Sequence, residues 1–246
     1  RGTSGSLETA SNGDCDAVAS GDVQQISGVA DVSDISRHVR LTVDDTQSDN
    51  DNGDTGAIAG DSIQYTASTA TLDAGTYYLD TLQVPGGNTL SVNTASGPVT
   101  IAVKDYADIQ GTFAVSGDSI VRVYIKGENA ISGKHLRVTG GGHVHVANDD
   151  SPELRFYGQD DLQSIISGGQ VTGVIYAPPG SSGTSSLHID HGALLGGGVV
   201  ADTVIGTQGS VHYDEALEGN QIVSRDAKII TITYLHISEN EIEVTG

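Results

Sequence analysis

The carboxylates of one short acidic tract are the side chains best suited to bind a cation. Residues 44–54 read Asp-Asp-Thr-Gln-Ser-Asp-Asn-Asp-Asn-Gly-Asp. Carboxylate and amide oxygens around a glycine turn are the ligands that Ca²⁺ takes. We therefore predict a site for calcium or a similar cation, formed by Asp44, Asp45, Asp49, Asp51 and Asp54. Position 59, where an EF-hand would carry its bidentate glutamate, is an alanine, so the site is not an EF-hand. The competing interpretation is a solvated acidic loop.

Several histidines have the spacing of transition-metal ligands. His143 and His145 alternate along one predicted strand, which would place both imidazoles on the same face. His188 and His191 flank Asp190, and stacking of the chain would bring them near the first pair. Neutral imidazole suits zinc or copper. The competing interpretation is the ordinary polar side of half-buried strands.

Carboxylates near the end of the chain come nearest to a catalytic pair. The candidates are Asp190 beside His191, Asp202 by itself, and Asp214 with Glu215 near His212. Two carboxylates at a suitable separation hydrolyse glycosides. However, residues 213–215 read more simply as the end of a turn. The chain has few basic residues, no glycine-rich phosphate loop before a helix, and no serine or cysteine nucleophile motif. We therefore expect no enzyme, no catalytic residues and no certain cofactor, with a polysaccharide-acting β-helix enzyme as an alternative.

The elements that position these side chains are short strands. Residues 1–36 are rich in glycine, serine and aspartate and have weak periodicity, so we interpret them as an N-terminal segment suited to pair with another subunit. A first strand is predicted at 38–43, where Val39, Leu41 and Val43 alternate with polar residues. It leads into the acidic loop and completes a unit over residues 37–70.

Residues 71–220 contain strand-like runs of three to six residues separated by glycine, asparagine, aspartate or proline. Only 2 Phe and no Trp or Met are present, so the core must consist of small and β-branched residues. This texture predicts an all-β fold, a β-solenoid with coils near twenty residues and no strict repeat. The alternative is an antiparallel β-sandwich. Residues 221–246 are predicted to form a C-terminal β-hairpin, with strands at 228–237 and 241–244.

The charge balance indicates habitat. The chain has 32 acidic residues against 11 basic ones, a net charge of −21. Repulsion at that charge destabilises a compact fold unless salt screens it, and at molar salt the Debye length falls to about 3 Å. We interpret the protein as halophilic, the alternative being an ordinary secreted acidic protein. The same negative field disfavours nucleic acid as a partner.

The sequence also bears on membrane and targeting segments. No stretch has the roughly 20 consecutive apolar residues of a membrane helix, so we expect no membrane span in this chain. The opening Arg-Gly-Thr-Ser-Gly-Ser is not a signal peptide, and we expect a mature form whose targeting segment has been removed. Cys15 is the one cysteine and is interpreted as a passive thiol.

Four stretches carry a resemblance to a known group of proteins. They are residues 173–179 (Gly-Val-Ile-Tyr-Ala-Pro-Pro), the glycine block at 194–201, residues 211–215 (Val-His-Tyr-Asp-Glu) and the ending at 234–244. Over residues 75–246 the chain resembles the C-terminal β domains of uncharacterised halophilic-archaeal surface proteins, which are often preceded by a pilin-like helix. A related pattern occurs in bacterial proteins associated with type IV pili. The chain departs from these by lacking the hydrophobic pilin-type N-terminus.

Together these features predict an extracellular or cell-surface structural protein. We expect a self-assembling subunit of a pilus-like filament, in which one copy donates a terminal segment to the sheet of the next, head to tail. The alternative is a monomeric surface-anchored adhesin that binds surface glycans. That alternative predicts an exposed cluster drawn from Tyr77, Tyr78, Tyr106, Tyr124 and Tyr157.

Overall fold

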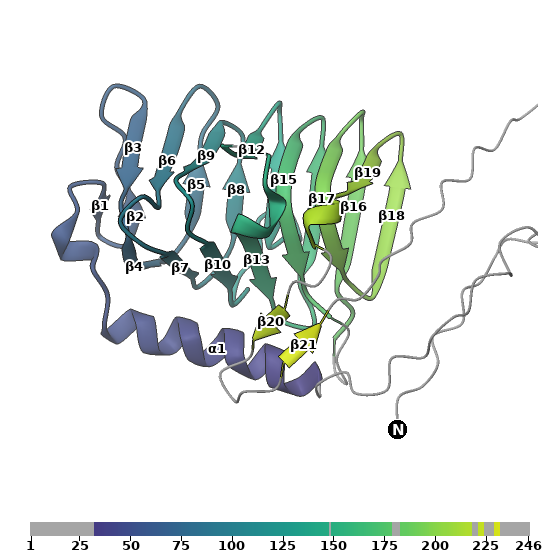
Figure 1. Cartoon of the computed structure of the whole chain (residues 1–246), viewed down its shortest axis with the longest axis horizontal. Helices are drawn as coiled ribbons and strands as arrows, with labels where there is room; N and C mark the ends of the chain where they lie inside the picture. The colour runs from purple at the N-terminus through teal and green to yellow at the C-terminus, as the bar shows by residue number, and fades with distance from the viewer. Residues whose placement is uncertain (1–31, 148, 179–182, 218–220, 224–228, 232–246) are drawn as a thin grey trace, which may run out of the picture.

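The fold is a β-solenoid whose coils stack along the long axis of the molecule (Figure 1). The computed structural model describes residues 32–147, 149–178, 183–217, 221–223 and 229–231. Strands that are neighbours in a layer run parallel, as β4 (Gly75–Leu79) and β7 (Val99–Val103) do. The predicted solenoid is therefore confirmed and the antiparallel sandwich is wrong.

Each coil contributes strands at three positions. The first position is occupied by β4, β7, β10 (Val121–Ile125) and β13 (Leu154–Gly158). The second is the six-stranded sheet of β5 (Leu82–Val84), β8 (Ala107–Ile109), β11 (Leu136–Thr139), β14 (Gln163–Ser167), β16 (Ser186–Asp190) and β18 (Thr203–Thr207). The third is occupied by β3 (Thr69–Leu72), β6 (Thr89–Asn93), β9 (Thr112–Ser116), β12 (His143–Val146) and β19 (Ser210–Tyr213).

Two long strands join the third position of one coil to the first position of the next. They are β15 (Gln170–Tyr176) and β17 (Leu194–Val200). The chain turns the corner inside each strand at Gly173 and Gly197, whose φ values of 154° and 141° favour glycine. A Cβ on Gly197 would lie 2.0 Å from the carbonyl oxygen of Gly173. Close stacking of these two corners therefore explains the glycine block.

The interior is filled by alternate residues of the strands. In β6 and β9, for example, Leu90, Val92, Phe113 and Val115 point inward and are buried, while their polar neighbours face outward. This period-two pattern follows from strand geometry. The core consists mainly of valine, leucine and isoleucine. Valine and isoleucine are the β-branched residues that the composition predicts, whereas leucine was not part of that prediction.

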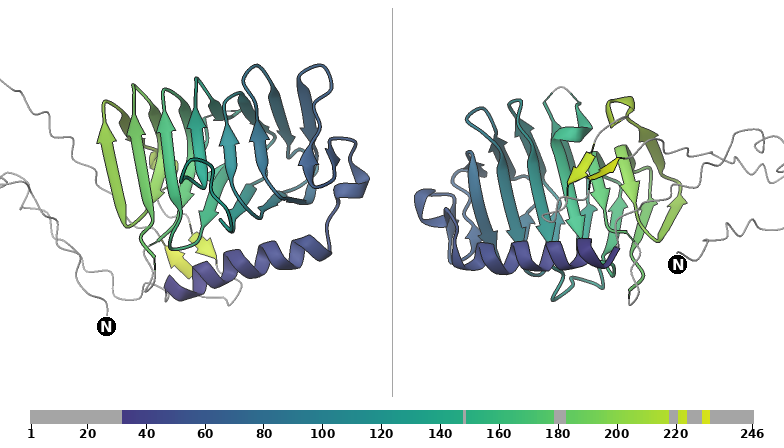
Figure 2. Two further views of the ribbon diagram at one scale, coloured as in Figure 1. Left: turned by 180° about the vertical axis from the view of Figure 1, so that it is seen from behind. Right: turned by 60° about the horizontal axis from the view of Figure 1, so that its bottom comes forward.

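A helix covers one outer face of the solenoid, and it replaces the strand predicted at 38–43. Helix α1 (Val32–Ser48) lies along the first strand position, across successive coils (Figures 1 and 2). Its buried apolar side chains are Ile35, Val39 and Val43, four residues apart, and Thr46 is buried one turn further on, whereas Leu41 is 37% exposed. The strand prediction was wrong because Val39 and Val43 also fit a helical stripe that begins at Ile35. The helix also crosses the boundary placed at residue 36.

The helix packs on an outward row of residues that stack in register from coil to coil. We call this the tyrosine row; it consists of Tyr78, Ala102, Tyr124, Tyr157, Tyr176 and Val200. The rings of Tyr124 and Tyr157 are stacked with centroids 5.0 Å apart, and His38 of α1 meets Tyr124 edge-on at 5.5 Å. This second, external core fixes the helix to the solenoid.

The ends of the chain are described only in part. Residues 1–31 and most of the predicted C-terminal hairpin lie outside the described residues. Within 221–246, β20 (Gln221–Val223) pairs antiparallel with β21 (Ile229–Thr231). In the part of the chain that the structure describes, no helix has the length and apolarity to cross a membrane.

Candidate functional site

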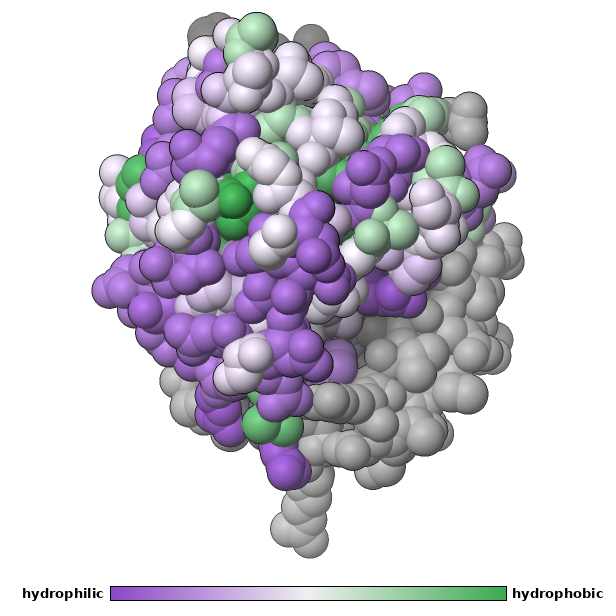
Figure 3. All heavy atoms as spheres, turned by 90° about the vertical axis from the view of Figure 1, so that its left-hand side faces the viewer, coloured by the Kyte–Doolittle hydropathy of each residue, from purple (hydrophilic) through white to green (hydrophobic). Residues whose placement is uncertain are grey.

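The two ends of the solenoid differ in how the core is covered, and this difference defines the candidate site. At the first end, a hairpin of β1 (Ile58–Ala59) and β2 (Ser62–Ile63) lies over the core. Ala57 and Ile58 are buried there as part of the core, and Ile63 and Tyr65 pack against it. The space-filling view of this end is largely hydrophilic, with a few scattered apolar residues (Figure 3). The core is therefore capped at this end.

The acidic loop protects the first edge strand. The N–H of Thr76 in β4 donates to Oδ2 of Asp51 over 2.7 Å, and the N–H of Asp51 donates to the Thr76 carbonyl over 2.7 Å. The side chain of Asn52 repeats this one step on: Nδ2 donates to the Tyr78 carbonyl (2.7 Å) and Oδ1 accepts from the Tyr78 N–H (3.1 Å). These bonds occupy the backbone groups that a further strand would use.

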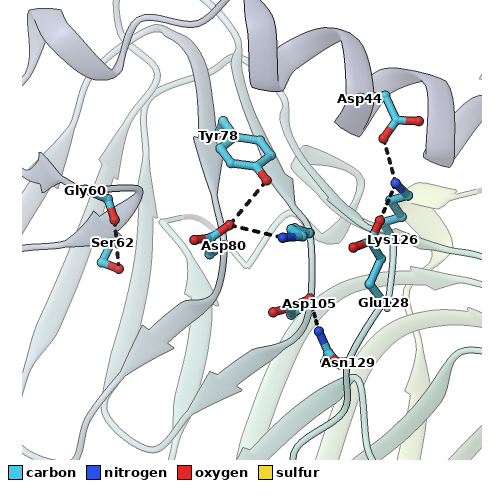
Figure 4. Close-up of polar contacts among 10 residues, drawn as sticks. Asp44, Gly60, Ser62, Tyr78, Asp80, Asp105, Lys126, Glu128 and Asn129 are labelled. Atoms are coloured by element: carbon cyan, nitrogen blue, oxygen red, sulfur yellow. Dashed lines mark hydrogen bonds and ion pairs between the residues drawn. The ribbon is translucent and has the colours of Figure 1, made fainter.

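The five aspartates predicted to bind a cation do not converge. Asp44 in α1 forms an ion pair with Lys126 over 2.6 Å (Figure 4), Asp51 holds Thr76, and Asp45, Asp49 and Asp54 are exposed. Among the described residues, no group of three or more His, Cys, Asp or Glu side chains is arranged to hold a metal ion. The cation site stays a prediction, and this arrangement gives it no support.

The opposite end of the solenoid terminates in an exposed strand. All five residues of β18 are exposed, and within the described residues β18 pairs with β16 alone. Val204 continues the inward row of Leu187 yet is 45% exposed, and Ile205 is 40% exposed. Among the described residues, one other large apolar side chain is more than a third exposed, Leu41 at 37%. The end of the core is thus open at β18.

The chemistry of this edge suits the addition of a strand. The sequence of β18, Thr-Val-Ile-Gly-Thr, contains no charged residue and no proline, the devices that usually block an edge. An unpaired edge presents a row of N–H and C=O groups, which an extended segment can pair while side-chain pockets supply specificity. We call β18, with its exposed Val204 and Ile205, the open edge.

The carboxylates considered for catalysis have structural partners. Oδ2 of Asp214 accepts from the N–H and Oγ of Ser151, at 3.1 and 2.6 Å, and Oδ1 accepts from the N–H of Ala216 at 2.9 Å. Burial acts to raise the pKa of Asp214, but these hydrogen bonds outweigh it and the pKa lies below its ordinary value. Asp214 therefore ties the turn after β19 to the turn before β13.

Asp190 and His191 do not form a catalytic triad with the nearby hydroxyl. Both Asp190 Oδ1 and Ser167 Oγ lie close to the same atom, Nδ1 of His191, at 3.0 and 3.2 Å. A triad needs the hydroxyl and the carboxylate on opposite ring nitrogens. Hydrogen bonds from Ser167 and His191 lower the pKa of Asp190 below its ordinary value.

The exposed tyrosine cluster expected of a sugar-binding surface is absent from the described residues. Tyr77 points into the core, and Tyr78, Tyr124 and Tyr157 belong to the buried tyrosine row beneath α1. Tyr106 alone of the five is half-buried, and its hydroxyl accepts from Gln83. Burial under a helix that was predicted as a strand explains this error.

The histidines are separated by the fold. His143 and His145 share one outer face, as predicted, with ring centroids 4.9 Å apart. His188 lies on the second strand position and His191 in the turn that follows. Stacking does not bring the two groups together into one metal site.

Sequence reasoning missed the open edge itself. In the sequence, Val204 resembles the inward-pointing residues of the other strands, and its exposure follows only from its position in the last coil. No curated protein and no solved structure shows significant similarity to the chain. A family model does match it, over residues 18–220, a span that includes α1, the capped end and the open edge. The chain therefore belongs to the family described as a domain of unknown function, DUF7305.

Proposed function

We propose that the protein is a non-enzymatic structural subunit of an extracellular, pilus-like surface filament, joined to the next subunit at the open edge. The observation that carries this proposal is the asymmetry of the two ends: one is capped and its edge strand is blocked by Asp51 and Asn52, whereas β18 is exposed. The edge accepts an added strand from a second copy of the chain, contributed by a terminal segment of that copy that lies outside α1, β20 and β21.

Charge supports a copy-to-copy contact at this position. Two chains of net charge −21 repel one another over most of their surfaces. Strand β18 itself contains no carboxylate, so backbone groups and apolar side chains of two copies can meet there. Molar salt screens the remaining repulsion, since the Debye length there is about 3 Å. The resemblance to halophilic-archaeal surface proteins agrees with assembly in brine at the cell surface.

Negative-stain electron microscopy in roughly 2–3 M salt tests the proposal, since salt at that level screens repulsion between subunits. We expect filaments from the unaltered protein, and discrete particles from Ile205→Lys, which places an ammonium group on the open edge. Ala59→Lys puts the same charge on the exposed surface of the capping hairpin and should leave the filaments intact. Discrete particles from the unaltered protein at high concentration would overturn the proposal.

The alternatives lack a comparable observation. A monomeric glycan-binding adhesin was predicted to expose tyrosines that the structure buries. A polysaccharide-acting enzyme was predicted to use Asp190 and Asp214, whose carboxylates have the structural partners described above. Discrete particles that bind in a glycan panel would favour the adhesin.

A further inference from the structure

The outer face of the third strand position differs from the rest of this acidic protein. Its strands β3, β6, β9, β12 and β19 contain no Asp, Glu, Lys or Arg. The outward residues are small hydroxyl or uncharged side chains that stack in register, such as Thr69, Thr89 and Thr112. Three imidazoles interrupt these rows. His212 stands alone on β19, whereas β12 carries two: His143 stands next to Thr112, and His145 next to Ala114.

The two histidines are placed to share one ion. They are two residues apart on one strand, so both point outward, and their rings are tilted by 35° with centroids 4.9 Å apart. The last side-chain torsion of histidine is soft, so small ring rotations can direct one nitrogen of each ring at a common point. His143 is exposed and His145 half-buried. The adjacent Ala114 leaves space beside His145 that a threonine or larger residue would reduce.

Imidazole is the side chain that most often binds transition-metal ions in proteins. A neutral imidazole has a free lone pair for a metal ion.

We propose that His143 and His145 form a chelating site for a borderline divalent transition-metal ion, with Cu²⁺ bound most tightly. The protein supplies two ligands there, since no third His, Cys, Asp or Glu of the described residues joins them, and water completes the coordination. A tetragonal set of nitrogen and oxygen ligands is the preference of Cu²⁺ and Ni²⁺, and affinities of divalent ions rise to Cu²⁺ in the first-row series. Hard cations such as Mg²⁺ and Ca²⁺ prefer oxygen ligands, so molar concentrations of them do not compete for this site.

Calorimetric titration of the full chain with Cu²⁺ in 2 M NaCl tests the site, in a Cys15→Ser background that removes the thiol as a ligand. We expect one Cu²⁺ per chain at this site. His143→Thr and His145→Thr each restore the residue type found elsewhere in the row and should each weaken binding by at least tenfold. His188→Thr, which removes a histidine that stands alone on β16, should change it by less than twofold.

Pulsed electron paramagnetic resonance of the Cu²⁺ complex gives a second measurement that does not depend on the variants. The spectrum of the unaltered site should show two coordinated imidazole nitrogens, and each single variant should show one. The inference is overturned if either single variant binds Cu²⁺ like the unaltered chain, if His188→Thr loses as much affinity, or if the unaltered site shows one imidazole. Binding at the open edge plays no part in this test, so its outcome is independent of filament formation.

Discussion

Replacing Val39 by alanine is a direct test of how α1 is held on the solenoid. Val39 is fully buried against the tyrosine row. Removing its two methyl groups forfeits about 1.6 kcal/mol of transfer free energy, and the space left behind adds roughly 1 kcal/mol. Alanine favours a helix over valine by about 0.5 kcal/mol, which offsets part of the loss. We therefore expect Val39→Ala to lower the free energy of unfolding by about 2 kcal/mol.

Leu41→Ala is the matched control on the same helix. Leucine loses more atoms than valine, yet Leu41 is 37% exposed on the outer side of α1, so we expect a loss of about 1 kcal/mol at most. The assay is urea unfolding in 2 M NaCl, followed by the fluorescence of the nine tyrosines in a chain without tryptophan. If residues 38–43 formed a strand, positions 39 and 41 would share a face and Leu41→Ala would cost more. That ranking would refute the helical packing.

Four further predictions concern single residues and their contacts. Gly197→Ala should destabilise the fold by more than about 3 kcal/mol, because its Cβ has no space; Gly53→Ala, where nothing lies within 4 Å, should be nearly neutral in urea unfolding. Because the pKa of Asp214 is lowered in the folded protein, its stabilising contribution is present above the unfolded pKa and is lost as the pH falls through the folded pKa. In an acid titration, Asp214→Asn should therefore lose stability less steeply than the unaltered protein below about pH 4. Lys126→Met removes the ion pairs to α1 and Glu128, and its destabilisation should be larger in 0.1 M than in 3 M NaCl. Burial raises the pKa of Tyr124 to about 12, so the proton it retains stabilises the fold below pH 10, and absorbance titration should show this stabilisation lost as the pH rises towards 12.

The strands of the solenoid were predictable because each carries its own evidence. A run such as 99–103 alternates inward and outward residues within five positions and ends at a turn, so no distant residue is needed to identify it. The stacking was less predictable. The number of residues between stacked partners changes from coil to coil. Val121 and Leu154 are farther apart in the sequence than Val99 and Val121, because long loops enlarge the third coil. No fixed repeat length marks those partners.

The helix and the acidic loop required information from distant parts of the chain. Val39 and Val43 satisfy both a strand pattern and a helical one, and the tyrosine row beneath them decides between the two. Likewise, an aspartate that binds calcium and one that holds a strand edge have the same sequence context. The role of Asp51 becomes clear only from its hydrogen bond with Thr76, 25 residues further along the chain. The pairing of His143 with His145 was predictable because it is local to one strand.

The course of α1 across the coils has a consequence for how the protein unfolds. In a solenoid each coil contacts only its neighbours, so terminal coils can fray while the middle stays folded. Here one rigid element contacts β4, β7, β10 and β13, and Ser36 accepts a hydrogen bond from the N–H of Asp160. Opening any one of these coils therefore breaks contacts with a helix that the other coils keep in place. The helix converts a stack of weakly linked layers into a single cooperative unit, and coils beyond its reach, such as the one ending in β18, are the first to open.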